Sequence, residues 1–227
     1  PDIGSNSIPF QTLKFDMRKY YKINRNYSLA ARLMLGKSVG DRPQKFFLGG
    51  NSQMMIFSDT QTEGRDDSGF YAQRVLDYDN TSILEDVYFS EYVFPLRGAR
   101  YRERVGENVA VANFEFRFPF VNYVDVSFPA RIRFGNIFGH LFLDIGAAWD
   151  SSDEFDNSEL VRSKYGLTDP KASPILTTFG IGTKIFTPFA LIRIDTAWDK
   201  YPSGGYSKPQ YIAVSYTHLT LPTTSAV

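Results

Sequence analysis

Hydrophobic and polar residues alternate along several stretches of the chain with a period of two. In the stretch 113–120, phenylalanine occupies every second position from 114 onward, and Asn113, Glu115 and Arg117 alternate with the phenylalanines. Successive side chains of a β-strand point to opposite faces, so this alternation predicts a strand with one apolar and one polar face. The same pattern recurs in the stretches 13–18, 27–36, 139–149, 175–185 and 190–198.

The polar face of these predicted strands carries full charges of both signs. They are Lys14, Asp16, Arg18, Arg32, Glu115, Arg117, Asp144, Lys184, Arg193 and Asp195. The outer face of a soluble β-sandwich could carry such charges too. However, several of these strands are about ten residues long, whereas most strands have ~5–6 residues and a tilted strand that crosses a bilayer needs ~9–11. The strand length therefore favours a transmembrane β-barrel.

Aromatic residues gather near the ends of the predicted strands. They are Tyr20, Tyr21, Phe118, Phe120, Trp149, Phe186, Phe189 and Trp198. Transmembrane barrels carry girdles of aromatic side chains at both membrane interfaces. The positions of these residues again favour a barrel that spans a membrane.

The connections between the predicted strands alternate between short and long. Residues 22–26 and 186–189 are short links, whereas 39–107, 150–173 and 199–210 are long. Short inner turns and longer outer loops are typical of a transmembrane barrel. The stretch 122–136 leaves two interpretations open, because it could extend the flanking strands into a longer hairpin or form an inner turn with an insertion.

The composition narrows the class of function. The 227 residues include 25 Lys plus Arg and 25 Asp plus Glu, and this zero net charge argues against a protein that binds nucleic acid. Cysteine is absent, which excludes disulfide scaffolds, thiol catalysis and Cys-ligated metals. No apolar run reaches the ~18 residues of a transmembrane helix. Since no catalytic or phosphate-binding motif occurs, we expect no enzyme activity, no cofactor and no bound metal.

Two further groups of residues have an ordinary and a functional interpretation. The acidic residues Asp150, Asp153, Glu154, Asp156 and Glu159 have a spacing that loosely resembles a calcium site, but a solvated outer loop explains them better. His140 has no second histidine nearby in the sequence, and we expect a structural role for it.

An ordered set of short motifs resembles the C-terminal half of the barrel in the bacterial surface-antigen family, the BamA- and TamA-like outer-membrane assembly factors. The motifs are 49–50, 94–98, 114–119, 142–149, 180–182, Pro188 and 191–195, and the resemblance covers roughly Phe10 to Val214. It implies an all-β fold, a transmembrane antiparallel β-barrel of sixteen strands. The chain would supply about seven C-terminal strands within residues 1–214, with a long loop at 39–107 that folds into the lumen.

The two ends of the chain indicate a fragment. It begins at Pro1 without a signal peptide, and residues 214–219 resemble the translation of an adapter used in sequencing libraries. We therefore expect residues 215–227 to be a non-native or disordered tail. A genuine but unusual tail is the alternative.

Arg97 is the main candidate for a functional residue. The family carries a Val-Arg-Gly-Phe or Val-Arg-Gly-Tyr signature at the tip of the lumen loop, and the chain reads Leu-Arg-Gly-Ala at 96–99. The resemblance implies that Arg97 docks on Glu115 and Asp144 of the barrel wall. Physical reasoning supports the same contact, because carboxylates that line a lumen are partly desolvated and a forked guanidinium pairs well with them. Gly98 would allow a tight turn with positive φ.

An exposed loop charge is the alternative interpretation of Arg97. Further charges that we expect in the barrel interior are Arg117, Arg193 and Asp195. Alanine replaces the aromatic residue of the signature at position 99, and Tyr101 follows two residues later. The departure therefore concerns the aromatic packing of the loop tip and not the salt bridge.

The resemblance implies a protein of the bacterial outer membrane that helps to insert or translocate proteins there. Its partners would be outer-membrane lipid and lipopolysaccharide, client outer-membrane or secreted proteins, and accessory assembly subunits. A barrel that serves as membrane anchor or secretion pore for a soluble N-terminal module is one alternative. A soluble β-rich binding protein is another.

Overall fold

The computed structural model of the chain describes residues 10–41, 43–50, 91–93, 96–99, 103–121, 124–126, 132–134, 137–165, 172–186, 191–202 and 204–216. Most of the predicted tail, residues 217–227, lies outside these ranges, and so does the larger part of the predicted lumen loop. The expectations for those residues stay predictions.

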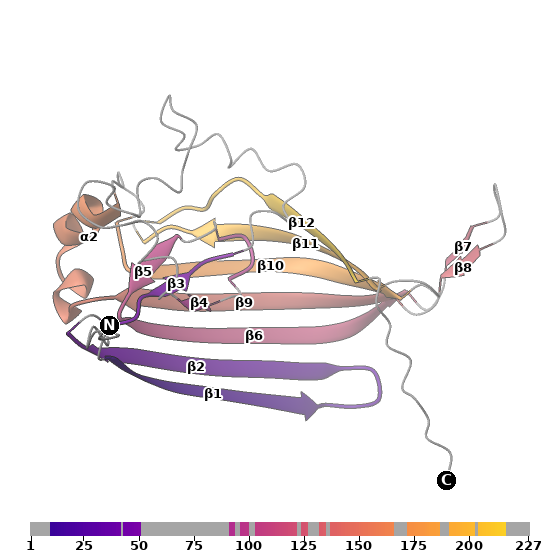
Figure 1. Ribbon diagram of the computed structural model, residues 1–227. Coiled ribbons are helices and arrows are strands. Elements are labelled where there is room, and N and C mark those ends of the chain that lie inside the picture. Colours follow the sequence, from indigo (N-terminus) through magenta and orange to yellow (C-terminus); the bar gives the residue numbers. More distant parts are fainter. Residues whose placement is uncertain are drawn as a thin grey trace, which may run out of the picture.

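Seven long strands form one antiparallel sheet. Their order is β1-β2-β6-β9-β10-β11-β12 (Figure 1). Their bounds are β1 Phe10–Lys22, β2 Ser28–Gly40, β6 Asn108–Val121, β9 Ile137–Trp149, β10 Ile175–Phe186, β11 Leu191–Lys200 and β12 Gln210–Tyr216. The predicted antiparallel all-β fold is confirmed. Within the described residues, β1 and β12 form the two edges and the barrel does not close.

The remaining elements are small. The strands β3 (Phe46–Leu48), β4 (Glu91–Val93) and β5 (Arg104–Gly106) form a three-stranded sheet in the order β4-β3-β5. The 3-10 helix η4 (Ser152–Phe155) and the helix α2 (Ser158–Tyr165) connect β9 to β10. Among the described residues, neither of these helices nor any other has the length and apolar character needed to cross a membrane.

The described residues between β6 and β9 favour the longer hairpin of the two interpretations of 122–136. The strands β7 (Val124–Val126) and β8 (Ile132–Phe134) pair with each other antiparallel. Val124 pairs with Phe134 in the same register that pairs Val121 of β6 with Ile137 of β9. Figure 1 shows β7 and β8 at one end of the large sheet and α2 at the opposite end, so the β9–β10 loop and the β6–β9 connection lie at different ends.

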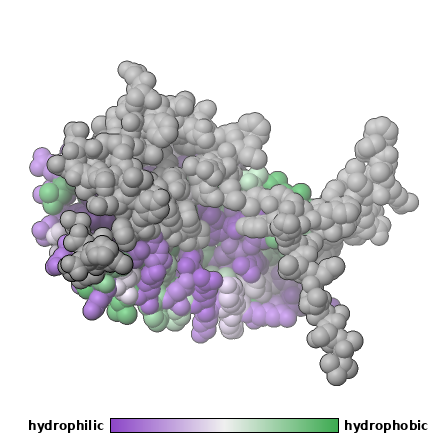
Figure 2. Space-filling model, viewed as in Figure 1, coloured by the Kyte–Doolittle hydropathy of each residue, from purple (hydrophilic) through white to green (hydrophobic). Residues whose placement is uncertain are grey.

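The two faces of the large sheet differ as the alternation predicts. One face exposes large hydrophobic side chains, among them Leu13, Phe15, Met17, Leu29, Phe114, Leu141, Leu143, Ile181 and Ile194. The other face buries polar side chains, among them His140, Asp144, Thr178 and Asp195. In Figure 2, hydrophilic side chains gather on the side of the sheet that faces the viewer, and hydrophobic ones appear at its margins. In a barrel, the apolar face contacts lipid and the polar face lines the interior.

Two members of the predicted aromatic girdle lie on the polar face. Tyr20 shares this face with Arg18 and lines the same pocket as that arginine. Phe186 shares it with Lys184, and its ring meets the ring of Phe138 edge-on, with 6.1 Å between the centroids. The prediction was wrong for both residues because adjacent positions of a strand face opposite sides, so aromatic residues at a strand end do not all point to lipid. Position 189 lies outside the described residues.

A hydrophobic cluster joins the small sheet to the large one. Phe46, Leu48, Leu96 and Ala99 of the β2–β6 insert pack against Met34, Val109, Val111, Ala148 and Leu176 on the polar face of the large sheet. This face is therefore apolar toward the α2 end and ionic farther along the strands. Gly146 allows the close approach, since a Cβ there would lie 2.9 Å from the Cδ1 of Leu96. The insert thus packs onto the interior face by apolar contacts as well as by charge.

Candidate functional site

Charged side chains of six strands and of the insert meet on the polar face of the large sheet. This interior cluster consists of Asp16, Arg18, Arg32, Arg97, Glu115, Arg117, His140, Asp144, Lys184, Arg193 and Asp195. The strand register creates it: Asn113 pairs with Asp144 and Arg117 with His140 across β6 and β9, and Lys184 pairs with Arg193 across β10 and β11. Side chains that share a face on adjacent strands lie within contact distance of one another.

Arg97 lies between Asp144 and Glu115. Its Nε and Nη2 donate to the two carboxylate oxygens of Asp144 at 2.7 and 2.8 Å, and its Nη1 donates to Glu115 Oε2 at 2.7 Å. The carboxylate of Asp144 is fully buried and also accepts from Asn113 Nδ2 at 3.0 Å. The structure therefore brings together the three residues that the sequence singles out, in the bidentate geometry that suits a guanidinium.

The loop tip around Arg97 is shaped by its neighbours in sequence. Gly98 has a φ of 86°, and a Cβ at this position would lie 2.6 Å from the Cβ of Ala197 on β11. Ala99 is buried in the hydrophobic cluster described above. An aromatic contact comes from β9 instead, because the guanidinium carbon of Arg97 lies 3.8 Å from the centroid of the Phe142 ring. A cation over an aromatic face is a favourable arrangement.

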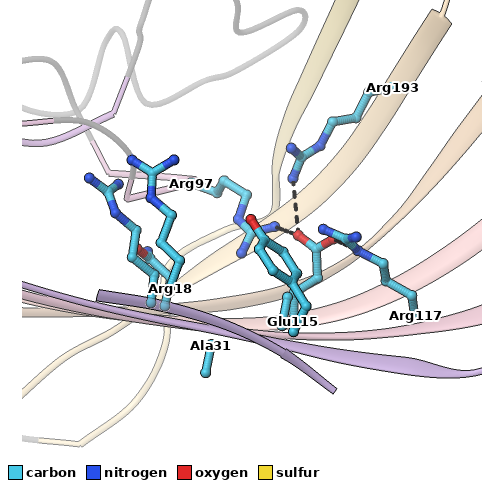
Figure 3. Close-up of a pocket in the computed structure, with 10 residues that line it drawn as sticks. Arg18, Ala31, Arg97, Glu115, Arg117 and Arg193 are labelled. Carbon is cyan, nitrogen blue, oxygen red and sulfur yellow. Dashed lines mark hydrogen bonds and ion pairs between the residues drawn. The ribbon is translucent and has the colours of Figure 1, made fainter. Parts of the chain in front are cut away.

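Glu115 is surrounded by four cationic side chains. Besides Arg97, it accepts from Arg117 Nε at 2.7 Å and from Lys184 Nζ at 2.9 Å, and Arg193 Nη2 lies 4.0 Å from its Oε2. Figure 3 shows Arg97, Arg117 and Arg193 directed at this carboxylate from three sides. A single carboxylate thus holds together side chains of the insert and of three strands.

Asp195 and His140 form a buried pair that the sequence did not indicate. His140 Nε2 lies 2.8 Å from Asp195 Oδ1, and both side chains are almost completely buried. Arg193 Nε donates to the second oxygen of Asp195 at 2.7 Å. The pair spans β9 and β11 across Gly182 of β10, where a Cβ would clash with both side chains. This contact agrees with a structural role for the histidine.

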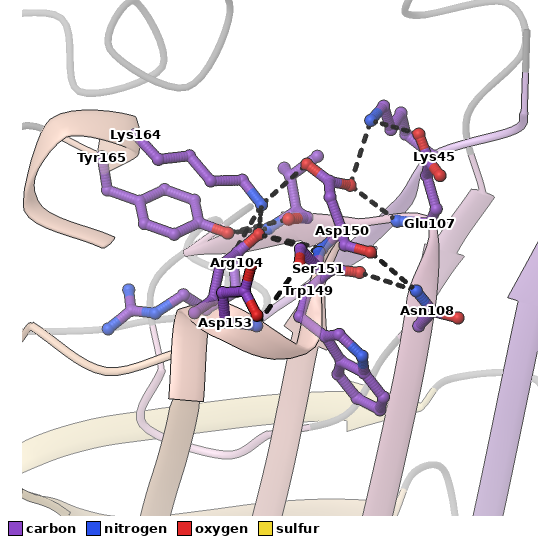
Figure 4. A network of polar contacts seen from close by, with 12 residues as sticks. Lys45, Arg104, Glu107, Asn108, Trp149, Asp150, Ser151, Asp153, Lys164 and Tyr165 are labelled. Atoms are coloured by element: carbon purple, nitrogen blue, oxygen red, sulfur yellow. Dashed lines mark hydrogen bonds and ion pairs between the residues drawn. The ribbon is translucent and has the colours of Figure 1, made fainter. Parts of the chain in front are cut away.

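A second polar cluster lies at the α2 end of the sheet (Figure 4). We call it the loop network, and its members are Lys45, Glu107, Asp150, Glu154 and Lys164. Lys45 Nζ lies 3.0 Å from both Glu107 Oε1 and Asp150 Oδ1. Lys164 Nζ lies 2.9 Å from Asp150 Oδ2 and 2.9 Å from Glu154 Oε1. The network therefore ties the β2–β6 insert to the β9–β10 loop.

The loop network changes the interpretation of the acidic residues at 150–159. Asp153, Asp156 and Glu159 are exposed as expected, but Glu154 is buried and Asp150 is held by two lysines. For Glu154 the prediction of a solvated loop was wrong, because Lys164 of the following helix pairs with it. Asp150 is exposed as expected, although two lysines pair with it. Among the residues that the structure describes, no group of acidic or histidine side chains is arranged to hold a metal ion.

The ion pairs in the loop network shift the pKa values of its side chains. Burial acts to raise the pKa of Asp150, but the hydrogen bond from Lys164 and the charge of Lys45 outweigh burial and lower it. Burial acts to lower the pKa of Lys45, and its carboxylate partners outweigh burial and raise it. The pKa of Lys164 is raised in the same way. Each group is therefore held in its charged form.

A hydroxyl group, together with an apolar cluster of Phe47, Val105, Val161 and Tyr165, docks helix α2 on the small sheet. Tyr165 Oη donates to the carbonyl of Val105 at 2.7 Å and accepts from its backbone N–H at 3.0 Å. These groups belong to β5, an edge strand of the small sheet. Burial raises the pKa of Tyr165. A single side chain thus satisfies both backbone groups of one residue on an edge strand, as a neighbouring strand would.

Comparison with known proteins identifies the domain. A family model described as the Omp85 superfamily domain matches residues 2–211, which include all of the large sheet up to the second residue of β12. No curated protein matches the chain.

Proposed function

The chain belongs to the Omp85 superfamily, whose members act in protein insertion or translocation at the bacterial outer membrane, and we propose that it forms part of the wall of such an assembly barrel. The seven-stranded sheet supplies the wall, and the insert between β2 and β6 acts as a plug anchored inside the lumen. The anchoring of Arg97 to Glu115 and Asp144 is the observation that carries this proposal.

In the proposed mechanism, the barrel assists proteins by backbone pairing and not by catalysis. Within the described residues β12 is one edge of the sheet. Where such an edge is open in the barrel wall, its N–H and C=O groups can pair with a strand of a client outer-membrane protein. Exposed leucine and phenylalanine side chains on the outer face contact lipid, and lipopolysaccharide contacts the exposed loops at the α2 end. Accessory subunits would bind parts of the intact protein outside this sheet.

Arg97 fixes the plug in one position while the wall opens and closes. The guanidinium satisfies two buried carboxylates at once, so the loop cannot leave without exposing an unpaired charge in a partly desolvated interior. The apolar contacts of Leu96 and Ala99 add to this anchoring. The plug position therefore depends on one side chain that a point mutation can remove.

The test is depletion of the full-length protein in its host, followed by complementation with wild type, Arg97→Ala or Arg25→Ala. Arg25 lies in the exposed β1–β2 turn and controls for the loss of one positive charge. We expect the folded content of other outer-membrane barrels to fall on depletion, to recover with wild type and Arg25→Ala, and to stay low with Arg97→Ala. Unchanged barrel content on depletion would favour the alternative in which the barrel anchors or secretes a soluble module.

A further inference from the structure

We propose that the interior cluster contains a binding site for an oxyanion, a carboxylate or phosphate group, between Arg18 and Arg117. The site is a cavity of about 200 Å³ on the polar face of the large sheet. Its lining includes five arginines, from β1, β2, β6, β11 and the insert, and one carboxylate, that of Glu115. The proposal requires only that this face is in contact with water, and it does not depend on the proteins that the barrel handles.

Among the residues that the structure describes, the charges in the cluster do not balance. The cationic side chains are Arg18, Arg32, Arg97, Arg117, Lys184 and Arg193, and the acidic ones are Asp16, Glu115, Asp144 and Asp195. Six cations against four carboxylates leave two positive charges, without counting His140. Like charges in a partly desolvated site repel one another, so an added anion would stabilise the arrangement.

The cations differ in how much of their donor capacity remains accessible. Arg97 is 12% exposed and is committed to two carboxylates. In contrast, the side chain of Arg18 is 56% exposed and that of Arg117 is 39% exposed. Each of these two arginines donates to one carboxylate, and a guanidinium carries five N–H donors in a fixed fork. They therefore keep donors for an incoming group.

The shape of the cavity also suits an oxyanion. The guanidinium carbon of Arg117 lies 6.0 Å from the centroid of the Tyr20 ring, and Tyr20 lines the cavity together with the two exposed arginines. Figure 3 shows Arg18 standing away from Glu115, whereas Arg117 and Arg193 point toward it. A liquid water occupies about 30 Å³, so the cavity has room for a phosphate or carboxylate group with several waters. Arginine pairs with both groups through two parallel hydrogen bonds.

The experiment is calorimetric titration of the full-length protein in detergent with inorganic pyrophosphate and, separately, with citrate. The two probes distinguish a site that prefers phosphate from one that prefers carboxylate. The variants are Arg18→Gln combined with Arg117→Gln, Arg18→Gln alone, and Asp16→Asn. Lys37→Gln, exposed near the end of β2, is the matched control for the loss of one positive charge.

We expect at least one probe to bind wild type and Lys37→Gln with equal affinity. The double variant should bind about tenfold more weakly, which corresponds to the loss of ~1.4 kcal/mol. Asp16→Asn should bind more tightly, because it removes the carboxylate that neutralises Arg18 and Arg32. This opposite sign separates anion binding from a general loss of structure.

Three results would overturn the proposal. They are no binding of either probe to wild type, unchanged affinity in Arg18→Gln, and unchanged or weaker affinity in Asp16→Asn. Since Arg18 is largely exposed, Arg18→Gln and Asp16→Asn keep the test decisive if the double variant does not fold. A failure here leaves the role in protein assembly untouched, because that role rests on Arg97.

Discussion

The interior cluster and the loop network are both built from charged side chains, but they hold the protein together in different ways. The interior cluster stands on long strands, its central carboxylates are held mainly by arginine, and it has more cations than anions. The loop network joins loop and strand-end segments, uses lysine, and has two cations against three carboxylates. The strand register and the planar guanidinium of arginine fix the positions of the side chains in the interior cluster. In the loop network, the ammonium of each lysine is a point charge on a flexible side chain, and it can bridge separate segments.

This difference separates a permanent anchor from a releasable one. In the interior, losing Arg97 removes the cation from a fully buried carboxylate, which keeps only the neutral hydrogen bond from Asn113. In the loop network, the side chains of Lys45 and Asp150 are about one-third exposed, so water can replace each lost contact. We therefore expect mutations in the interior to affect the whole barrel and mutations in the loop network to affect only the docking of loops.

The largest expected effect is that of Arg97→Ala. Breaking a buried ion pair from one side costs about 3–5 kcal/mol, because the carboxylate of Asp144 stays buried without the cation that pairs with it. The measurement is the free energy of unfolding by urea of the full-length protein in detergent. Arg25→Ala should leave this value unchanged. A loss of less than about 1 kcal/mol in Arg97→Ala, the range of surface ion pairs, would show that the two clusters do not differ in this respect.

The next largest effect is expected for Tyr165→Phe, which removes the hydroxyl that pairs with Val105. A buried backbone group that loses its partner costs about 1–3 kcal/mol. The cost should fall on the docking of α2 and not on the large sheet, so hydrogen exchange of the Val105 amide should speed up while that of β6 and β9 amides does not change. Tyr206→Phe, at an exposed position, serves as control. Equal exchange rates at Val105 in both variants would contradict the account.

The loop network should also respond to pH, with a direction that follows from the pKa shifts. The pKa of Asp150 is lowered in the folded state, so its contribution is present above the ordinary aspartate value and is lost as the pH falls through the lowered value. The pKa values of Lys45 and Lys164 are raised, so their contribution is present below the ordinary lysine value and is lost as the pH rises through the raised ones. The docking of the loops should therefore be constant between these limits.

Trp149 provides the measurement, because its ring contacts the ring of Phe155 in η4 at 5.2 Å between centroids. In a Trp198→Phe background it is the single tryptophan of this chain. Its fluorescence should stay constant from mildly acidic to mildly alkaline pH and change at strongly acidic pH. A transition near neutral pH would show that a group other than these three controls docking.

The smallest effect is expected for Lys45→Gln. Its partners Glu107 and Asp150 remain partly solvated, so the loss should be at most about 1 kcal/mol. Added salt should reduce the difference between Lys45→Gln and wild type, because salt screens exposed charges. Thermal unfolding at low and high salt measures both. A larger loss of stability that does not depend on salt would show that Lys45 behaves like the residues of the interior cluster.

The sequence predicted the strands and their faces because period-two alternation depends on each strand alone. The stretch 113–120 shows its apolar and polar faces without knowledge of any partner. The proximity of Arg97 to Glu115 and Asp144 required a second argument, since buried carboxylates need cations, together with the resemblance to a family. The alternation, the need of buried carboxylates for cations and the family resemblance together were enough to predict the centre of the candidate site.

Contacts that depend on register could not be predicted in this way. His140 and Asp195 lie on strands that are not adjacent, and they meet only because Gly182 of the strand between them has no side chain. The sequence did not indicate the apolar zone on the polar face of the large sheet, toward the α2 end. The side chains that cover this zone, Leu96 and Phe46, come from the insert between β2 and β6 and not from the strands of the sheet. The helix α2 lies in a polar segment, and Val161 and Tyr165 stabilise it through tertiary contacts.

In the proposed barrel, the face with Glu115 and Arg117 lines an aqueous interior closed by the Arg97 loop, while the face with Phe114 contacts lipid. Cysteine labelling of the full-length protein in its membrane tests this arrangement directly, and this chain contributes no background because it has no cysteine. We expect a water-soluble maleimide to label Arg117→Cys slowly, to label it faster when Arg97→Ala is added, and not to label Phe114→Cys in either background. Labelling of Phe114→Cys as fast as Arg117→Cys would contradict the account.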